Sequence, residues 1–357
     1  MRGQTERRSR ILAAFWVRLV CFAFALILVL SYLCYVLTPK YDYGICGMLN
    51  LYRQPRNSVD VLVVGTSLAY AGVNTNVLWQ EYGIAAYDLC SAEEPFWISY
   101  YAIREALKTQ RPKLILLDAK PAVYTQDYSK HARTILSTYG ILSLENRVGA
   151  TLACVEKPAD AVGYMLGIPQ VHGKYKELTL DDFRFPPDNG GRGDNWKGYI
   201  EQEDTERHNR PDLIWTDVQR PMNKREEAYA RKIFELVSAE GIPLILVGFP
   251  NPDYANDHMY YNRLWSVAEE YGITGINYNA PDLRFGLRYS SDFADWQHLN
   301  VKGSITFSRR LGEDLRAHYD LPDRRGDVSY ASYDACAEAW YQRYPAYDLE
   351  SAEEDQP

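Results

Sequence analysis

Short apolar runs, each bounded by turn-forming residues, recur along this chain and constrain its fold more than any other feature. The clearest run occupies residues 61–64, between Asn57-Ser58 and Gly65. Similar apolar runs lie at residues 114–117 and 244–247, and shorter strand-like segments lie at residues 87–89 and 275–278. A short apolar run such as 61–64 is typical of a strand buried on both faces, as the strands of parallel sheets are. The sequence therefore predicts five strands.

Amphipathic helical patterns separate these runs. In residues 223–240, for example, Ile233, Leu236 and Val237 fall on one helical face. Comparable patterns occupy residues 97–109, 260–271 and 301–315. Strands that alternate with helices predict a mostly parallel sheet covered on both sides. We therefore expect an α/β fold, a three-layer α/β/α sandwich, over residues 59–320.

Two segments depart from this alternation. Residues from about 125 to 222 lack clear strand runs, and their second half is rich in Pro, Gly, Asp and Asn. A stretch this long inside a compact domain is typical of an inserted cap or a functional loop. The C-terminal segment 321–357 is polar and aromatic and ends in an acidic run. We expect it to be a tail that frays.

The N-terminus has the composition of a membrane anchor. Residues 1–10 contain four arginines, and residues 11–37 are apolar apart from Arg18. At roughly 1.5 Å per residue, the uninterrupted part from residue 19 spans the roughly 30 Å hydrocarbon core. The positive-inside rule predicts a single-pass protein of the cell membrane, with a cytoplasmic N-terminus, a linker at 38–58 and an extracytoplasmic domain. A cleaved signal peptide is the alternative, but no Ala-x-Ala type site follows the run.

Charge and cysteine content bear on whether the protein binds nucleic acid, holds zinc or forms disulfides. The net charge is -8 and the pI is near 5.4, and no basic stripe lies beyond the first ten residues. These features argue against a surface that binds nucleic acid. Four cysteines lie outside the apolar stretch, without the CxxC spacing of a zinc site: Cys46, Cys90, Cys154 and Cys336. They allow three pairings into disulfides, or they are small buried hydrophobic residues.

A candidate nucleophile directly follows the first predicted strand. Ser67, in Gly65-Thr66-Ser67, stands at the carboxyl end of residues 61–64, the edge where parallel sheets gather their sites. Asp295 and His298, three residues apart in one predicted loop, supply an orienting carboxylate and a general base. Asp292 is a less well-spaced alternative to Asp295. The three residues together predict a Ser-His-Asp triad.

Three segments carry a resemblance to a known family: Val61-Leu-Val-Val-Gly-Thr-Ser67, Tyr82-Gly-Ile-Ala-Ala-Tyr-Asp-Leu89 and Asp295-Trp-Gln-His-Leu-Asn300. The chain resembles the SGNH (GDSL-like) hydrolase superfamily over residues 58–316. It is similar to its membrane-anchored bacterial branch, which includes alginate-type polysaccharide O-acetylation proteins and the teichoic-acid D-alanylation protein DltD. The resemblance implies a flavodoxin-like sheet and no metal or other cofactor. It also implies that Ser67 is the nucleophile, His298 the base and Asp295 its partner.

The family pattern also predicts where an oxyanion hole is built. Position 66 is Thr where the family usually has Asp, and Cys90-Ser91 follow the second strand where the family offers a glycine amide. We expect the backbone N–H groups of Ser67 and of Cys90 or Ser91 to bind the oxyanion. Glu93 is a candidate for the edge of the site and His172 for substrate contact. A solvated helix start and a surface position are the respective alternatives.

These observations predict a serine esterase or an O-acyltransferase that acts on acyl groups of a cell-surface or secreted polysaccharide. Transfer to a sugar would require a multi-span membrane O-acyltransferase to deliver the acyl donor, because one membrane helix cannot carry an acyl group across a bilayer. Hydrolysis needs no such partner. The alternative is a catalytically weak or inactive binding and assembly module of a glycan-modification complex.

Overall fold

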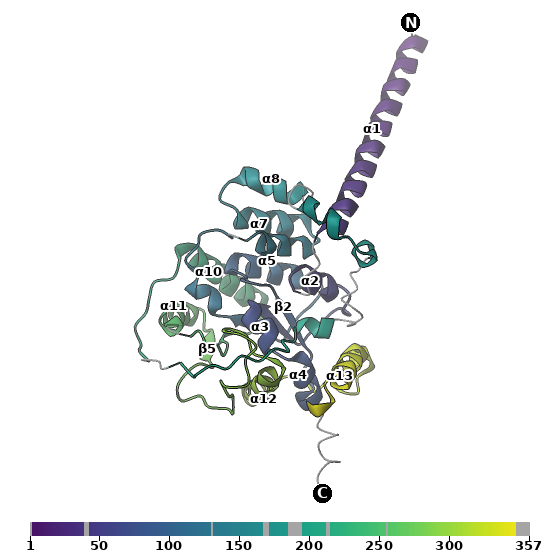
Figure 1. Cartoon of the computed structure of the whole chain (residues 1–357). Helices are drawn as coiled ribbons and strands as arrows, with labels where there is room; N and C mark the ends of the chain where they lie inside the picture. The colour runs from purple at the N-terminus through teal and green to yellow at the C-terminus, as the bar shows by residue number, and fades with distance from the viewer. Residues whose placement is uncertain are drawn as a thin grey trace.

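A five-stranded parallel sheet forms the centre of the molecule (Figure 1). The computed structural model describes residues 2–38, 43–129, 131–166, 171–184, 195–211, 215–254 and 256–347. The strands are β1 (Val61–Gly65), β2 (Ala86–Cys90), β3 (Leu114–Asp118), β4 (Leu244–Gly248) and β5 (Thr274–Asn277). Their order is β2-β1-β3-β4-β5, and every neighbouring pair is parallel, as in flavodoxin-like folds. The five predicted strands are thereby confirmed.

Helices cover both faces of the sheet, which confirms the three-layer prediction. Alternate residues of β1 point to opposite faces. Leu62 and Val64 belong to one core, with α5 (Phe96–Ala106), α10 (Lys224–Glu240) and α11 (Asp257–Glu269). Val61 and Val63 belong to the other core, with α3 (Ser67–Gly72), α4 (Thr75–Tyr82) and α12 (Val301–His318). β1 to β4 are buried along their whole length, as the uniformly apolar runs require.

Local capping fixes where the longest helices of the domain begin and end. The Asn223 side chain accepts hydrogen bonds from the N–H groups of Arg225 and Glu226 and so begins α10. Gly241 ends this helix in the left-handed conformation, with φ of 66°. Asn300 begins α12 in the same way as Asn223, by accepting the Gly303 N–H. The loop that carries Asp295 and His298 therefore leads directly into a well-anchored helix.

The first part of the predicted insertion, residues 132–166, is mostly helical and lies beside α5. It contains α6 (Ala132–Leu136), α7 (Leu144–Cys154) and α8 (Pro158–Leu166). α7 packs on α5, and α8 packs on α7. Residues 199–211 and 215–222 of the insertion form neither helix nor strand.

The shorter 3₁₀ turns of the described residues are η1 (Lys120–Val123), η2 (Ser137–Gly140), η3 (His172–Glu177), η4 (Leu180–Phe183), η5 (Asn195–Gly198), η6 (Val328–Tyr330) and η7 (Pro345–Tyr347). The Pro- and Gly-rich segment 186–194 lies outside the described residues.

Two segments differ from the sequence-based expectation. In place of a plain linker, α2 (Ile45–Leu51) is buried throughout, and its Gly47 carbonyl accepts the Tyr87 hydroxyl at 2.7 Å. In place of a frayed tail, α13 (Ala331–Arg343) packs on α4 and buries Trp340 completely. Apolar and aromatic side chains explain both differences. A short helix is unstable alone, but burial of these side chains against the domain stabilises both α2 and α13. Residues 39–42 and 348–357 lie outside the described part of the chain.

The N-terminal helix α1 (Arg2–Leu37) projects from the domain (Figure 1). Its segment Leu12–Leu37 has a mean hydropathy of 2.6 and is long and apolar enough to cross a membrane. Residues 12–33 are exposed, whereas Cys34, Val36 and Thr38 are buried against the domain. The helix therefore joins the folded core at its C-terminal turn.

The cysteines outside α1 are buried free thiols. Cys46, Cys90, Cys154 and Cys336 are each at most 7% exposed, and none forms a disulfide. Burial raises the pKa of Cys154 to about 12 and that of Cys90 well above its usual value. Of the two interpretations that the sequence left open, the structure shows small buried hydrophobic residues.

Candidate active site

Ser67 lies at the carboxyl edge of the sheet, as the first residue of α3. The chain turns sharply between β1 and α3 at Gly65, whose φ is 154°. A Cβ at this position would lie 2.2 Å from the Cβ of Asp118 in the neighbouring strand β3. Only glycine fits, because the two strands approach too closely for any side chain.

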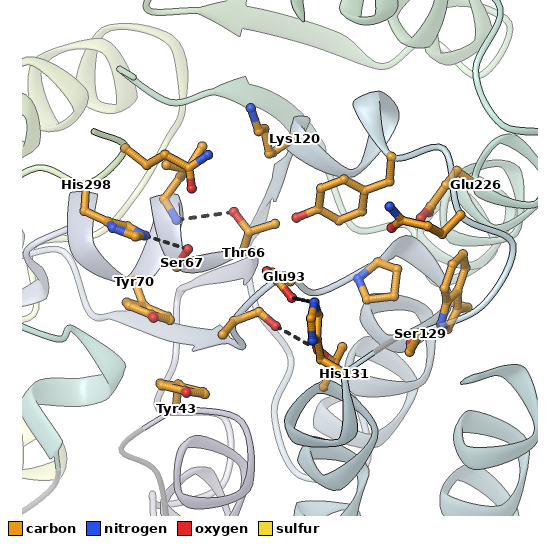
Figure 2. A pocket seen from close by; sticks show the side chains of 18 of the residues that line it. Tyr43, Thr66, Ser67, Tyr70, Glu93, Lys120, Ser129, His131, Glu226 and His298 are labelled. Carbon is orange, nitrogen blue, oxygen red and sulfur yellow. Dashed lines mark hydrogen bonds and ion pairs between the residues drawn. The ribbon is translucent and has the colours of Figure 1, made fainter. Parts of the chain in front are cut away.

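The structure brings the three residues of the predicted triad together. His298 Nε2 lies 2.7 Å from Ser67 Oγ (Figure 2), although 231 positions separate them in the chain. His298 Nδ1 lies 2.8 Å from Asp295 Oδ2 and 3.0 Å from Oδ1. One ring nitrogen therefore faces the hydroxyl and the other faces the carboxylate, the arrangement in which a histidine removes a proton from serine.

The Asp295 carboxylate is fixed by its own loop. Its Oδ1 accepts the backbone N–H groups of Gln297 and His298, both at 2.8 Å. A bridge between Phe293 and Leu299 closes the loop at its base. Burial by itself raises the pKa of Asp295, but the hydrogen bonds from His298 and Gln297 outweigh it and lower the pKa below its usual value. The carboxylate is therefore ionised and able to stabilise an imidazolium.

Asp292, the alternative to Asp295, has a different position. It is completely buried and accepts the Arg288 N–H at 2.7 Å and the Ser291 hydroxyl at 2.8 Å. These bonds shape the loop before the triad and do not involve His298. Its role is structural.

Thr66 and Asp118 stabilise the turn beneath the nucleophile. The Thr66 N–H donates to Asp118 Oδ2 at 3.1 Å, and the Thr66 hydroxyl donates to the same oxygen. The Thr66 hydroxyl also accepts the Leu68 N–H at 3.2 Å and so caps α3. Burial raises the pKa of Asp118, which these donors partly counteract. Sequence reasoning assigned no role to Asp118, because its partner is in another strand.

The two amides that the sequence suggested after β2 do not suit an oxyanion hole. The Ser91 N–H already donates to the Gly65 carbonyl at 3.0 Å, so it extends the β1–β2 ladder. Cys90 lies inside β2, is 3% exposed and does not line the cavity at Ser67. The Ser91 N–H is therefore occupied, because the ladder continues one residue past the strand.

Two other amides suit this role better. The Ser67 N–H, expected from the sequence, begins α3, and the Ala92 N–H belongs to the turn after β2. Both residues line the same cavity. Within the described ranges, neither N–H has a hydrogen-bond acceptor. A developing oxyanion at Ser67 can be bound by such free, fixed amides.

A cavity of about 420 Å³ extends from Ser67. Ser67 and His298 lie at one end, and Glu226 and Ser129 lie at the other (Figure 2). Aromatic side chains contribute much of the wall: Tyr43, Tyr70, Trp97, Tyr124, Tyr128 and Trp296. Tyr43 and Tyr70 stack with their ring centroids 5.3 Å apart. The cavity has the size of sites that hold whole small molecules, so it has room for more than a small acyl group.

Glu93 lies at the edge of this cavity, as the sequence suggested. It adopts a φ of 52° in the turn after β2, and its carboxylate lies 3.5 Å from His131 Nε2. Both side chains are about half exposed. His172 belongs to η3, which packs against α1, and its side chain lies outside the described residues. The structure therefore supports a cavity position for Glu93 alone.

Sequence reasoning did not identify Glu226, which lines the far end of the cavity. Its side chain is completely buried, and Oε2 accepts the Phe96 N–H at 3.0 Å. In the part of the chain that the structure describes, Oε1 has no partner. Burial raises the pKa of Glu226 well above its usual value, which favours the protonated form of the carboxyl group. In the sequence Glu226 looks like an ordinary acidic residue in the first turn of a helix.

His258 is not part of this site. It is buried and stacks on Trp215, with ring centroids 4.8 Å apart. Burial lowers its pKa. Asp257, its neighbour, pairs with Lys120 at 2.7 Å. The described ranges contain no group of three or more side chains arranged to hold a metal ion.

Two comparisons of the chain with known proteins found no match. No protein-family model matches the chain, and no curated protein matches it at a significant level. Membership of the SGNH superfamily therefore stays a prediction from the three sequence segments.

Proposed function

We propose that the protein is a membrane-anchored serine esterase or O-acyltransferase of the SGNH type that acts outside the cytoplasm. The observation that carries this proposal is the 2.7 Å approach of Ser67 Oγ to His298 Nε2, with Asp295 bound to the opposite ring nitrogen. A serine hydroxyl without such a base is a poor nucleophile. The position of Ser67 at the carboxyl edge of a parallel sheet supports the same conclusion.

The reaction would proceed through an acyl-enzyme. Ser67 Oγ attacks the ester carbonyl carbon while His298 Nε2 takes the serine proton, and Asp295 stabilises the imidazolium. The N–H groups of Ser67 and Ala92 bind the oxyanion of the tetrahedral intermediate. The C–O bond to the alcohol then breaks, and His298 returns the proton to the leaving oxygen. Water or a sugar hydroxyl attacks the acyl-enzyme with His298 again as base.

We infer that the substrate is an acylated polysaccharide. Aromatic walls such as Trp97, Tyr124 and Tyr128 can pack on the apolar faces of sugar rings. The buried Glu226 carboxyl, whose Oε1 has no partner among the described residues, offers a hydrogen-bond donor to a hydroxyl or an ester oxygen when it is protonated. If the acceptor is a sugar, a multi-span membrane O-acyltransferase would have to supply the acyl donor.

Active-site labelling of the full-length protein in detergent tests the catalytic proposal. We expect a fluorophosphonate probe to label the wild type and Ser290→Ala, in which an exposed loop serine is removed. Ser67→Ala should lose labelling and should lose p-nitrophenyl acetate hydrolysis. Equal labelling of wild type and Ser67→Ala would exclude Ser67 as nucleophile. Absence of labelling in every variant would favour the non-catalytic assembly module.

A partition experiment distinguishes hydrolysis from transfer. The wild type is supplied with p-nitrophenyl acetate and increasing concentrations of an oligosaccharide. A transferase should convert a rising share of the released acetyl groups into acetylated sugar, whereas an esterase should release acetate throughout. Mass spectrometry of the oligosaccharide measures the share.

A further inference from the structure

A second cavity, of about 350 Å³, lies where α1 joins the domain. The last three turns of α1 form one wall through Ile27, Leu30, Ser31, Cys34, Tyr35 and Thr38. The domain forms the other wall through Ile45, Leu49, Tyr139, Leu142, Arg147 and Met165. This cavity shares no lining residue with the cavity at Ser67. It therefore requires an explanation separate from the proposed catalysis.

The position of this cavity along α1 places it at a membrane boundary. The apolar segment Leu12–Leu37 has 26 residues and, at about 1.5 Å per residue, exceeds the roughly 30 Å hydrocarbon core. Ile27 and Leu30 are exposed within this segment, whereas Cys34 is buried against the domain. In a membrane that α1 spans, the end of the cavity at Ile27 and Leu30 lies beside the acyl chains of the leaflet next to the domain. The end at Cys34 lies at the level of the headgroups.

Arg147 is the charged side chain that lines this cavity. Its guanidinium lies over the Tyr139 ring, 4.7 Å from the centroid. Among the described residues it has no carboxylate partner, and its Nε is buried without a hydrogen-bond acceptor. Arg147 is partly buried, and a buried N–H without an acceptor is costly, so this position favours an anionic ligand that accepts hydrogen bonds.

Three hydroxyl groups around the cavity already have acceptors inside the protein. The Tyr139 hydroxyl donates to the Tyr164 carbonyl, and the Tyr35 hydroxyl donates to the Arg184 carbonyl. Thr38 Oγ1 donates to the Cys34 carbonyl at 2.7 Å. The site therefore combines a cation that has no carboxylate partner in the described part of the chain with an apolar wall, which matches a phosphate group attached to an acyl chain.

Exposed apolar side chains continue the same surface. Leu142 is 58% and Leu144 70% exposed at the start of α7, and Leu180 is 83% exposed in η4. η4 packs against α1, and the Tyr32 hydroxyl donates to the Phe183 carbonyl at 3.2 Å. An apolar surface that is continuous with a membrane-spanning helix is suited to contact the bilayer.

We propose that this cavity binds one anionic phospholipid from the leaflet next to the domain. The phosphate accepts hydrogen bonds from Arg147, and one acyl chain packs between Ile27 and Leu30 of α1 and Leu49 of α2. Basic pockets beside membrane helices bind lipid headgroups in this way. The assignment depends on α1 lying in a membrane and does not depend on catalysis at Ser67.

Photocrosslinking in vesicles tests the site. The full-length protein is reconstituted in phosphatidylcholine vesicles that contain phosphatidylglycerol with a photoreactive acyl chain. We expect crosslinks on α2, which carries Leu49, and on the last turns of α1. Arg147→Gln should reduce the α2 crosslinks about tenfold, the scale of one charge-assisted hydrogen bond. Arg147→Lys should retain part of them.

Arg284→Gln, which changes an exposed arginine in the loop after β5, is the matched control and should crosslink like the wild type. A zwitterionic photoreactive lipid should label α2 about tenfold less than phosphatidylglycerol. Crosslinks confined to α1, or equal α2 crosslinking in wild type and Arg147→Gln, would overturn the proposal. Thermal unfolding of each variant distinguishes loss of the lipid site from loss of the fold.

Discussion

Asp295 shows how single residues define the candidate site. It accepts the ring N–H of His298 and the backbone N–H groups of Gln297 and His298, so the loop that supplies the base also orients it. The three-residue spacing in the sequence was sufficient to predict this pair. It was not sufficient to predict that Ala92 and Glu226 line the cavity. The position of Ala92 depends on where the β1–β2 ladder ends, and that of Glu226 depends on how α10 packs beside the cavity.

Replacing Asp295 with Asn should lower kcat for p-nitrophenyl acetate by about 10³- to 10⁴-fold. The amide cannot stabilise the imidazolium and favours the wrong ring tautomer. Asp292→Asn is the matched control, since Asp292 lies in the same loop but does not contact His298. We expect it to reduce thermal stability and to retain most of the activity. Similar kcat losses in both variants would mean that Asp295 acts only through the loop.

At the scale of elements, the strands were predictable and two helices were not. β1, β3 and β4 are buried on both faces, so their apolar runs are visible in the sequence. α2 is buried on every side, and its seven residues lack the polar face by which a helix is usually identified. α13 buries Trp340 and Tyr333 among charged neighbours, so its composition resembles that of a polar tail. Its packing partner α4 is more than 200 residues earlier in the chain.

Glu105 connects three elements and should make stability depend on pH. It lies in α5 and accepts hydrogen bonds from Tyr52, after α2, and from Ser143 and Asn146, at the start of α7. Burial alone raises the pKa of Glu105, but these donors outweigh it and lower the pKa to about 2. The ionised carboxylate therefore stabilises the fold above its unfolded pKa of 4.5, and this contribution is lost as the pH falls towards 2.

Glu105→Gln should reduce the free energy of unfolding at neutral pH by up to about 3 kcal/mol. The difference from the wild type should shrink between pH 4.5 and 2. Urea unfolding of the full-length protein in detergent at several pH values measures it. Glu145→Gln, which removes a 75% exposed carboxylate paired with Arg104, should change the free energy by less than about 1 kcal/mol. A pH-independent difference for Glu105→Gln would contradict the assigned pKa.

At the scale of the whole molecule, the sequence predicted the layers and the apolar helix but not how the two connect. The cysteines make the arrangement across a membrane testable, because five are buried and the exposed one, Cys21, lies inside the apolar segment Leu12–Leu37, so the background for thiol labelling should be low. Ser329 is exposed in η6, on the domain. In intact cells, Ser329→Cys should react with a membrane-impermeant maleimide, whereas Thr5→Cys should react only after the membrane is permeabilised. The reverse pattern would contradict an extracytoplasmic domain.

The burial of Cys34 and Val36 against the domain has a consequence for how far from a membrane the proposed active site can act. A domain on a flexible linker can move to different distances from the membrane. A domain that packs against the end of its own membrane helix keeps its active site at one distance from the membrane. Ser67 would then meet only those chains of the cell envelope that pass through a thin layer close to the bilayer. A substrate would then have to carry its acyl group at the right distance from the membrane as well as fit the cavity.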